Sequence, residues 1–105
     1  MDIKLVRLYD VYAPLLSERQ REIMTLYYNE DESLAEIAEN TGITRQGVRD
    51  HIKKCEGQLL GFEEALGLCK RLDALRACAS RAQNALEEDD GKALFAALEE
   101  LSELL

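Results

Sequence analysis

Basic and amide side chains recur after Gly42 at spacings that a helix places on one side. Arg45, Arg49 and Lys53 are four residues apart, so an α-helix carries all three on one face. Further groups able to bind phosphates or base edges lie beside them: Thr44, Gln46 and Lys54. Guanidinium, ammonium, hydroxyl and amide groups can donate hydrogen bonds to phosphate oxygens and to base edges. These six residues therefore predict a nucleic-acid contact.

Position along the predicted helix separates two roles within this set. Arg45 and Gln46 come first, where a helix-turn-helix places the residues that contact base edges. The other basic groups are expected to hold phosphates: Arg49, Lys53 and Lys54. Asp50 lies one turn from both Gln46 and Lys54, so a carboxylate adjoins the predicted contact face.

The acidity of the chain opposes tight nonspecific binding to nucleic acid. The 105 residues carry 21 acidic and 13 basic side chains, for a formal net charge of -8. Nonspecific affinity comes mainly from neutralised phosphates, so binding is expected to be weak and salt-sensitive unless two copies combine their contacts. A homodimer is therefore the expected assembly. A solvated basic stripe with no partner is the alternative interpretation.

A compact turn must position that helix. A helix-turn-helix needs a small residue that faces the partner helix and a glycine four positions later, and Ala38 and Gly42 fill these roles. Gly42 can take a positive φ, and Thr44 can cap the next helix. Val48 and Ile52, at i and i+4, are expected to face inward. The segment therefore predicts a helix-turn-helix.

Two capping boxes predict where the preceding helices begin. Ser17 with Gln20 and Ser33 with Glu36 both have the form in which side chain and backbone satisfy each other's polar groups. Abundant Leu, Ala and Glu favour an all-α fold. The predicted helices cover Ile3–Tyr12, a segment from Ser17, Leu34–Asn40, a segment after Thr44, a segment from Leu68 and Lys92–Leu105.

A single domain is predicted over residues 1–105, with the helix-turn-helix core at about 3–60 and a helical tail at about 61–105. The glycines at 57 and 61 predict a bend or a short loop between the two parts. The tail carries an apolar stripe: Leu68, Leu72, Leu75, Ala79, Ala82 and Leu86. That stripe is expected to form either an intrachain helix seam or a homodimer interface.

The residues give little support for a metal site, a cofactor site or a catalytic site. The three cysteines at 55, 69 and 78 form no CxxC pair, and they are expected to be small packing residues. His51 is expected to make a local hydrogen bond or to take a partial core position, so no metal, cofactor or catalytic site is predicted. No apolar run approaches the roughly 20 residues that span a bilayer, and the N-terminus lacks a signal-peptide core. A cytoplasmic protein without membrane insertion, and not an enzyme, is expected.

The predicted helix-turn-helix and the helix before it resemble two known groups of proteins. The runs "SERQREIMTLYY" and "SLAEIAENTGITRQGVRDHI" resemble region four of bacterial sigma factors, which binds a promoter element. More closely, the segment from Leu8 to Glu56 resembles the YlxM family of small helix-turn-helix proteins, most specifically in "YYNEDESLAEIAE" and "ITRQGVRDHIKK". The chain departs from the family pattern at Arg49, where an aromatic residue is common, and at Gly47, where Ala is common.

The resemblance to YlxM implies a regulatory or accessory role in the signal recognition particle pathway, and it supplies no catalytic residues. Two functions stay open. One is a dimeric DNA-binding regulator that places two helices in successive major grooves. The other is an interaction module that binds the RNA or the protein of the signal recognition particle. Acidic surfaces suit a basic partner, while duplex RNA would be contacted through its backbone or loops.

Overall fold

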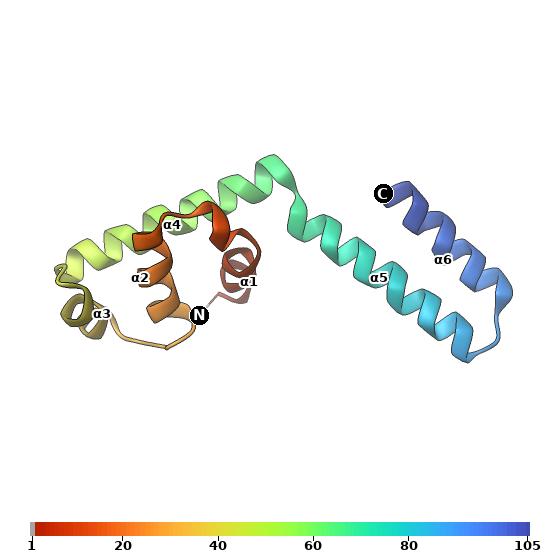
Figure 1. Cartoon of the computed structure of the whole chain (residues 1–105), viewed down its shortest axis with the longest axis horizontal. Coiled ribbons are helices and arrows are strands. Elements are labelled where there is room, and N and C mark those ends of the chain that lie inside the picture. Colours follow the sequence, from red (N-terminus) through yellow and green to blue (C-terminus); the bar gives the residue numbers. More distant parts are fainter. Residues whose placement is uncertain (1) are drawn as a thin grey trace. The chain divides into compact units, whose positions relative to one another are not determined.

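The computed structural model describes residues 2–105, which form six α-helices and one short 3-10 helix without a strand. In chain order the elements are α1 (Ile3–Tyr12), η1 (Ala13–Leu15), α2 (Glu18–Tyr28), α3 (Leu34–Thr41), α4 (Arg45–Leu66), α5 (Leu68–Glu87) and α6 (Gly91–Leu104), as Figure 1 shows. The predicted all-α fold is confirmed.

Two compact units make up the described chain. The first ends at Leu66 and contains α1 to α4, while the second runs Gly67–Leu105 and contains α5 and α6. Gly67 has φ +60°, a left-handed conformation that glycine adopts without a Cβ penalty. The predicted single domain requires that the two units unfold together, and this stays a prediction.

The first unit buries large side chains from each of its four α-helices. α4 contacts α1, α2 and α3, so its inner face lies at the centre of the unit. The buried residues are Leu8, Tyr9, Tyr12, Leu16, Ile23, Met24, Tyr28, Ile37, Val48, Ile52, Cys55 and Leu59. Burying an aliphatic or aromatic side chain of this size stabilises a fold by about 1.5–3 kcal/mol. The unit therefore carries a hydrophobic core of its own.

Buried phenol groups in this core have polar partners. The Tyr9 hydroxyl donates to the Arg21 carbonyl at 3.1 Å and lies 2.7 Å from the Thr25 hydroxyl. The Tyr12 hydroxyl donates to Glu63 Oε1 at 2.6 Å. Because a buried hydroxyl without a partner costs about 1–3 kcal/mol, these bonds make the tyrosines compatible with the core.

Both predicted capping boxes are formed. Ser17 Oγ accepts from the Gln20 amide at 3.2 Å, and the Ser17 amide donates to Gln20 Oε1 at 2.9 Å. Ser33 and Glu36 make the same reciprocal pair, with both distances at 3.1 Å. The starts of α2 and α3 are therefore fixed by their own sequences.

The predicted bend near residues 57 and 61 is wrong, because α4 continues without a break to Leu66. Gly57 and Gly61 lie on the exposed side of the helix, while Cys55 and Leu59 are buried on its inner side. Packing of that inner side outweighs the helix-propensity penalty of about 1 kcal/mol for each glycine.

The second unit is a helix hairpin with small residues between its helices. Cys78 and Ala85 of α5 and Ala97 of α6 are buried. Three residues of the predicted apolar stripe, Leu68, Ala79 and Leu86, are exposed in the single chain, so its role as an intrachain seam or as a homodimer interface stays a prediction. The prediction that the three cysteines are packing residues is confirmed, because all three are buried thiols.

Candidate nucleic-acid interface

The turn between α3 and α4 has the predicted conformation. Gly42 ends α3 with φ +74°, and its amide donates to the Ala38 carbonyl at 2.9 Å. Thr44 then caps α4, because its Oγ1 accepts from the Gly47 amide at 3.0 Å. Left-handed glycine at a helix end followed by a threonine cap is the local chemistry of a tight helix-helix turn.

Close packing fixes α4 against this turn. Ile37 of α3 and Val48 and Ile52 of α4 are buried, so the two helices share one apolar contact. A Cβ at Gly47 would lie 2.6 Å from Ile43 Cγ2, so the branched side chain of Ile43 already fills the space that an alanine needs. Gly47 is thus a close-approach position, which gives a physical reason for the departure from the family pattern.

The six predicted contact residues all lie on the surface: Thr44, Arg45, Gln46, Arg49, Lys53 and Lys54. Across residues 2–105, the structure shows no ion pair that holds the four basic groups among them. The Thr44 hydroxyl oxygen serves the cap, but the hydroxyl can still donate to another group. The start of α4 therefore presents donors and positive charge to solvent.

An acidic residue divides this surface. Gln46 Nε2 donates to Asp50 Oδ1 at 2.9 Å, so the Gln46 amide is held along the helix. The two side chains together present oxygen acceptors in the middle of a basic surface. A carboxylate at this place repels phosphate and favours a group that donates hydrogen bonds.

Two open hollows flank the exposed side of α4. The first is lined by Ser17, Arg19, Gln20, Gly47, Asp50, His51 and Lys54. The second is lined by Tyr27, Leu34, Arg49, Ile52, Lys53 and Glu56. Lys54 therefore lies on the flank of α2's first turn, while Arg49 and Lys53 lie on the flank of α3's first turn. The structure separates basic groups that the sequence pattern treats as neighbours.

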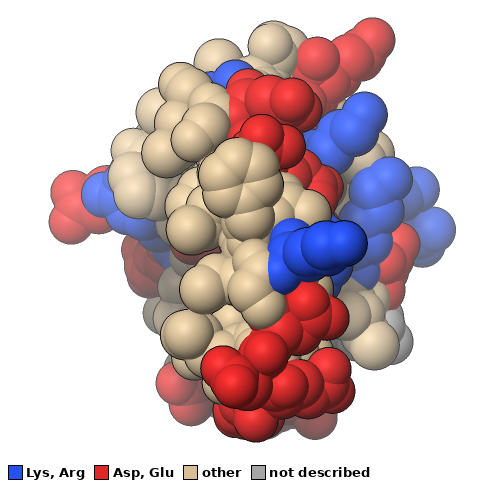
Figure 2. Space-filling view, turned by 90° about the vertical axis from the view of Figure 1, so that its right-hand side faces the viewer, with Lys and Arg blue, Asp and Glu red and all other residues tan. Residues whose placement is uncertain are grey.

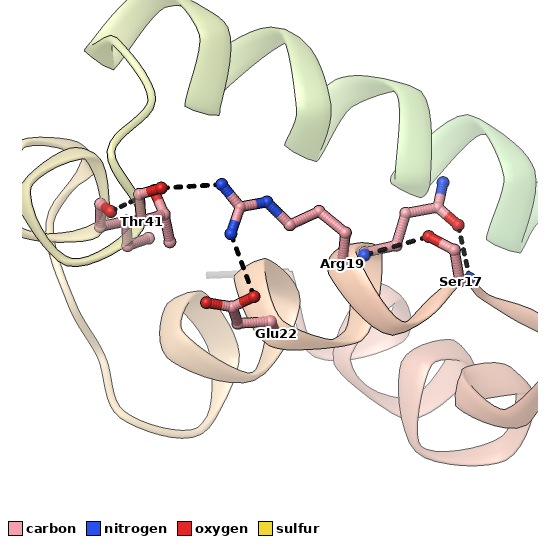
Figure 3. A network of polar contacts seen from close by, with 6 residues as sticks. Ser17, Arg19, Glu22 and Thr41 are labelled. Atoms are coloured by element: carbon pink, nitrogen blue, oxygen red, sulfur yellow. Dashed lines mark hydrogen bonds and ion pairs between the residues drawn. The ribbon is translucent and has the colours of Figure 1, made fainter.

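Arg19 is a positioning residue that the sequence pattern did not identify. Its guanidinium extends from α2 to the end of α3, where Nη2 donates to the Thr41 carbonyl at 2.8 Å (Figure 3). Nη1 forms an ion pair with Glu22 at 3.1 Å. Arginine near a helix C-terminus can satisfy a carbonyl that lacks a helical partner. Only the fold brings Arg19 and Thr41 together, since 22 residues separate them.

A buried tyrosine restrains the acidic group of the second hollow. The Tyr28 hydroxyl donates to Glu56 Oε2 at 2.6 Å. Burial, together with the hydrogen bond and the charge of Glu56, raises the pKa of Tyr28 well above its usual range, so the phenol stays protonated. Glu56 is thereby tied to the core on the same flank as Arg49 and Lys53.

The capped turn, the packed second helix and its exposed donors define a helix-turn-helix protein. The family model described as "Putative helix-turn-helix protein, YlxM / p13 like" (UPF0122) matches residues 1–96. The chain belongs to this family, which confirms the resemblance found in the sequence. The family description names a helix-turn-helix and no catalytic activity.

Curated relatives match the chain over part of its length. A "UPF0122 protein" of Clostridium perfringens (strain SM101 / Type A) is 53% identical over 66 residues, which cover 63% of this chain and 59% of the relative. A "UPF0122 protein" of Clostridium botulinum (strain Alaska E43 / Type E3) is 46% identical over 69 residues, covering 66% and 63%. The matched part thus spans about three fifths of these relatives.

No helix within residues 2–105 combines the length and apolar character needed to cross a membrane. In the same part of the chain, no group of three or more His, Cys, Asp or Glu side chains is placed to hold a metal ion.

Proposed function

We propose that this chain is a cytoplasmic, non-enzymatic regulator that binds DNA by placing the first turns of α4 in the major groove. The exposed cations at the start of α4, which make no ion pair within the described chain, carry this proposal. An α-helix about 10–12 Å across fits a major groove about 12 Å wide. The packed turn before α4 supports rigid presentation of these groups.

Side-chain chemistry assigns different contacts along α4. Arg45, in the first turn, suits a bidentate contact with guanine, while Arg49 and Lys53 suit phosphates. Asp50 and the Gln46 oxygen suit a base that presents an amino group, as cytosine does. Asp50 thus lowers general affinity for phosphate while favouring particular bases.

The test is DNA binding by a charge-matched pair of double variants. Fluorescence anisotropy would measure binding of a random-sequence duplex pool at about 50 and 200 mM salt. Arg45→Ala/Arg49→Ala removes two cations from the proposed interface. Arg76→Ala/Lys92→Ala removes two exposed cations from the second unit and serves as the control with the same net charge.

We expect the wild-type affinity to fall about 100-fold between these salt concentrations if four phosphates are neutralised. The interface variant should lose roughly tenfold or more in affinity and reduce the salt slope by about 1, since Arg49 is its phosphate contact and Arg45 its base contact, while the control stays near wild type. Equal losses in both variants would show that net charge alone controls binding. Wild-type protein that binds no duplex at low salt would refute the proposal.

A second candidate is an interaction module for the protein or RNA of the signal recognition particle. The excess of acidic side chains, 21 against 13 basic ones, favours it, since an acidic surface attracts a basic protein. The implication drawn from the YlxM resemblance points to the same partner. Titration of the particle protein and the particle RNA with the same variants distinguishes the candidates. Tight binding that the interface variant retains, together with no DNA binding, would favour this second function.

A further inference from the structure

In the α5–α6 hairpin, small apolar side chains lie between the helices and several large ones lie at the surface. Its helices meet through small side chains, among them the buried Cys78, Ala85 and Ala97. Larger side chains point to solvent, where Leu86 is 65% exposed, Phe95 64% and Leu98 48%. Exposure of these three large side chains forgoes hydrophobic stabilisation that their burial would supply.

One side of the hairpin carries charged and amide side chains around an open hollow, and we call it the polar side. Arg81 and Asn84 of α5, Glu88 directly after it and Glu100 of α6 line this hollow, together with Ala85, Ala93, Ala96 and Ala97. Arg81 also forms an ion pair with Glu100 across the two helices. These residues define which side of each helix belongs to the polar side of the hairpin.

The opposite side is apolar. On α5, Ala79 and Leu86 are seven residues apart and therefore lie on one side of the helix, away from Arg81 and Asn84. On α6, Leu98 lies away from Ala96 and Glu100 by the same geometry. The resulting outer leucine face comprises Leu68, Leu75, Ala79 and Leu86 of α5, Phe95 and Leu98 of α6, and Leu105 directly after α6.

Figure 2 shows a continuous strip of uncharged surface between clusters of acidic and basic side chains. Contiguous apolar patches larger than a few hundred Å² are rare on soluble monomers and mark interaction sites.

We propose that the outer leucine face binds the same face of a second copy of this chain, so that two hairpins form a four-helix bundle. The face contains no charged residue, so a charged partner would lose solvation there without gaining an ion pair. Within residues 2–66, the exposed large apolar residues lie on three separate elements: Ile3 on α1, Leu15 on η1, and Leu60 and Leu66 on α4. A second copy supplies a two-helix apolar face by symmetry.

The size of the face sets the expected strength of the dimer. The 14 residues of α6 extend about 21 Å, and two adjacent helices are about 20 Å wide. Pairing two such faces covers a footprint of about 800 Å² in total, below the roughly 1,200 Å² of stable interfaces. A dimer that dissociates in the micromolar range is therefore expected.

The net charge of the chain gives the proposed dimer a salt dependence opposite to that of nucleic-acid binding. Each copy has a formal net charge of -8, so the two copies repel each other at low salt. Added salt screens this repulsion and leaves an apolar contact intact. The dimer should thus strengthen with salt, whereas nucleic-acid binding should weaken.

The experiment is sedimentation equilibrium of the full chain, without nucleic acid, over a range of micromolar concentrations. Ala79→Glu places a charge on the outer leucine face, and Ala77→Glu places the same charge on the other side of the same helix. Both alanines are exposed, so neither variant disturbs the hairpin seam. Circular dichroism of each variant verifies that the helix content is unchanged.

We expect the wild type and Ala77→Glu to approach twice the chain mass of 11.9 kDa, with Ala79→Glu at least tenfold weaker in self-association. Leu98→Ala should weaken the dimer as well. A wild type that stays monomeric throughout, or equal association constants for Ala79→Glu and Ala77→Glu, would overturn the proposal. Because the measurement contains no nucleic acid, either result leaves the proposed DNA binding standing.

Discussion

The two units of this chain distribute the same kinds of residue in opposite ways. In the first unit, large side chains such as Met24 and Leu59 are fully buried, and the buried tyrosines have hydrogen-bond partners. In the second unit, alanine and cysteine lie between the helices, while Leu86 and Phe95 face solvent. The first unit thus buries its large apolar side chains in a core of its own. In the second unit, several large apolar side chains remain exposed to solvent.

The two units also differ in the kind of ligand that their exposed surfaces suit. The first unit holds α4 rigidly and leaves its basic groups exposed, which suits recognition of a charged ligand. The second unit exposes an uncharged face, which suits recognition of an apolar surface. The proposed nucleic-acid contact and the proposed self-association therefore involve separate parts of the sequence, so that variants can be designed against each one.

Truncating one leucine in each unit tests the comparison most strongly. Leu59→Ala should reduce the free energy of unfolding by about 2–5 kcal/mol, because the fully buried side chain leaves a cavity. Leu86→Ala should change it by no more than about 0.5 kcal/mol in the monomer, because this leucine is exposed. Urea denaturation followed by circular dichroism would measure both variants at two protein concentrations.

Protein concentration adds a second readout to these variants. If the outer leucine face forms a dimer, wild-type stability rises with concentration, and Leu86→Ala reduces that rise. Leu59→Ala should be destabilised at both concentrations. Similar losses for the two variants in dilute protein would contradict the contrast between the units.

Two glycines of α4 test how closely the first unit is packed at the turn. Gly57→Ala should stabilise the chain by roughly 0.5–1 kcal/mol, since no atom lies within 4 Å of the new Cβ. Gly47→Ala should instead destabilise it by about 1 kcal/mol, because its Cβ meets Ile43 Cγ2 at 2.6 Å and overpacking outweighs helix propensity. Thermal unfolding of both variants measures the difference, and equal stabilisation would show that Ile43 moves freely.

Local chemistry made much of the first unit predictable. The capping serines at 17 and 33, the positive φ of Gly42 and the cap at Thr44 depend on residues within a few positions of each other, so they follow from the sequence alone. The exposure of Arg45 and Arg49 follows from helical spacing in the same way.

Long-range packing accounts for what the sequence could not reveal. The contact of Arg19 with the end of α3 joins residues on two helices, and no local pattern indicates it. The uninterrupted α4 depends on burial of Leu59, which offsets the propensity penalty of Gly57. The stripe on α5 was ambiguous because Leu72 and Ala82 are half-buried while Leu86 is exposed, so its spacing fits both a seam and an outer face.

The smallest expected effect concerns the cap of α3, which belongs to the first unit alone. The amide and the hydroxyl of Ser33 lower the pKa of Glu36 below its usual 4.5. A lowered folded-state pKa means that this stabilisation is complete above about pH 4.5 and is lost as the pH falls through the folded value.

Glu36→Gln keeps an acceptor for the Ser33 amide but removes the titration. The stability advantage of the wild type over this variant should therefore shrink as the pH is lowered from about 6 to about 3. Urea midpoints across that range measure the change, with Glu39→Gln on the same helix as the control for loss of one carboxylate. The dimer constant should be the same for both variants, because α3 lies outside the hairpin. A Glu36→Gln profile parallel to the wild type would contradict this prediction, because it would mean that the cap contributes no pH dependence.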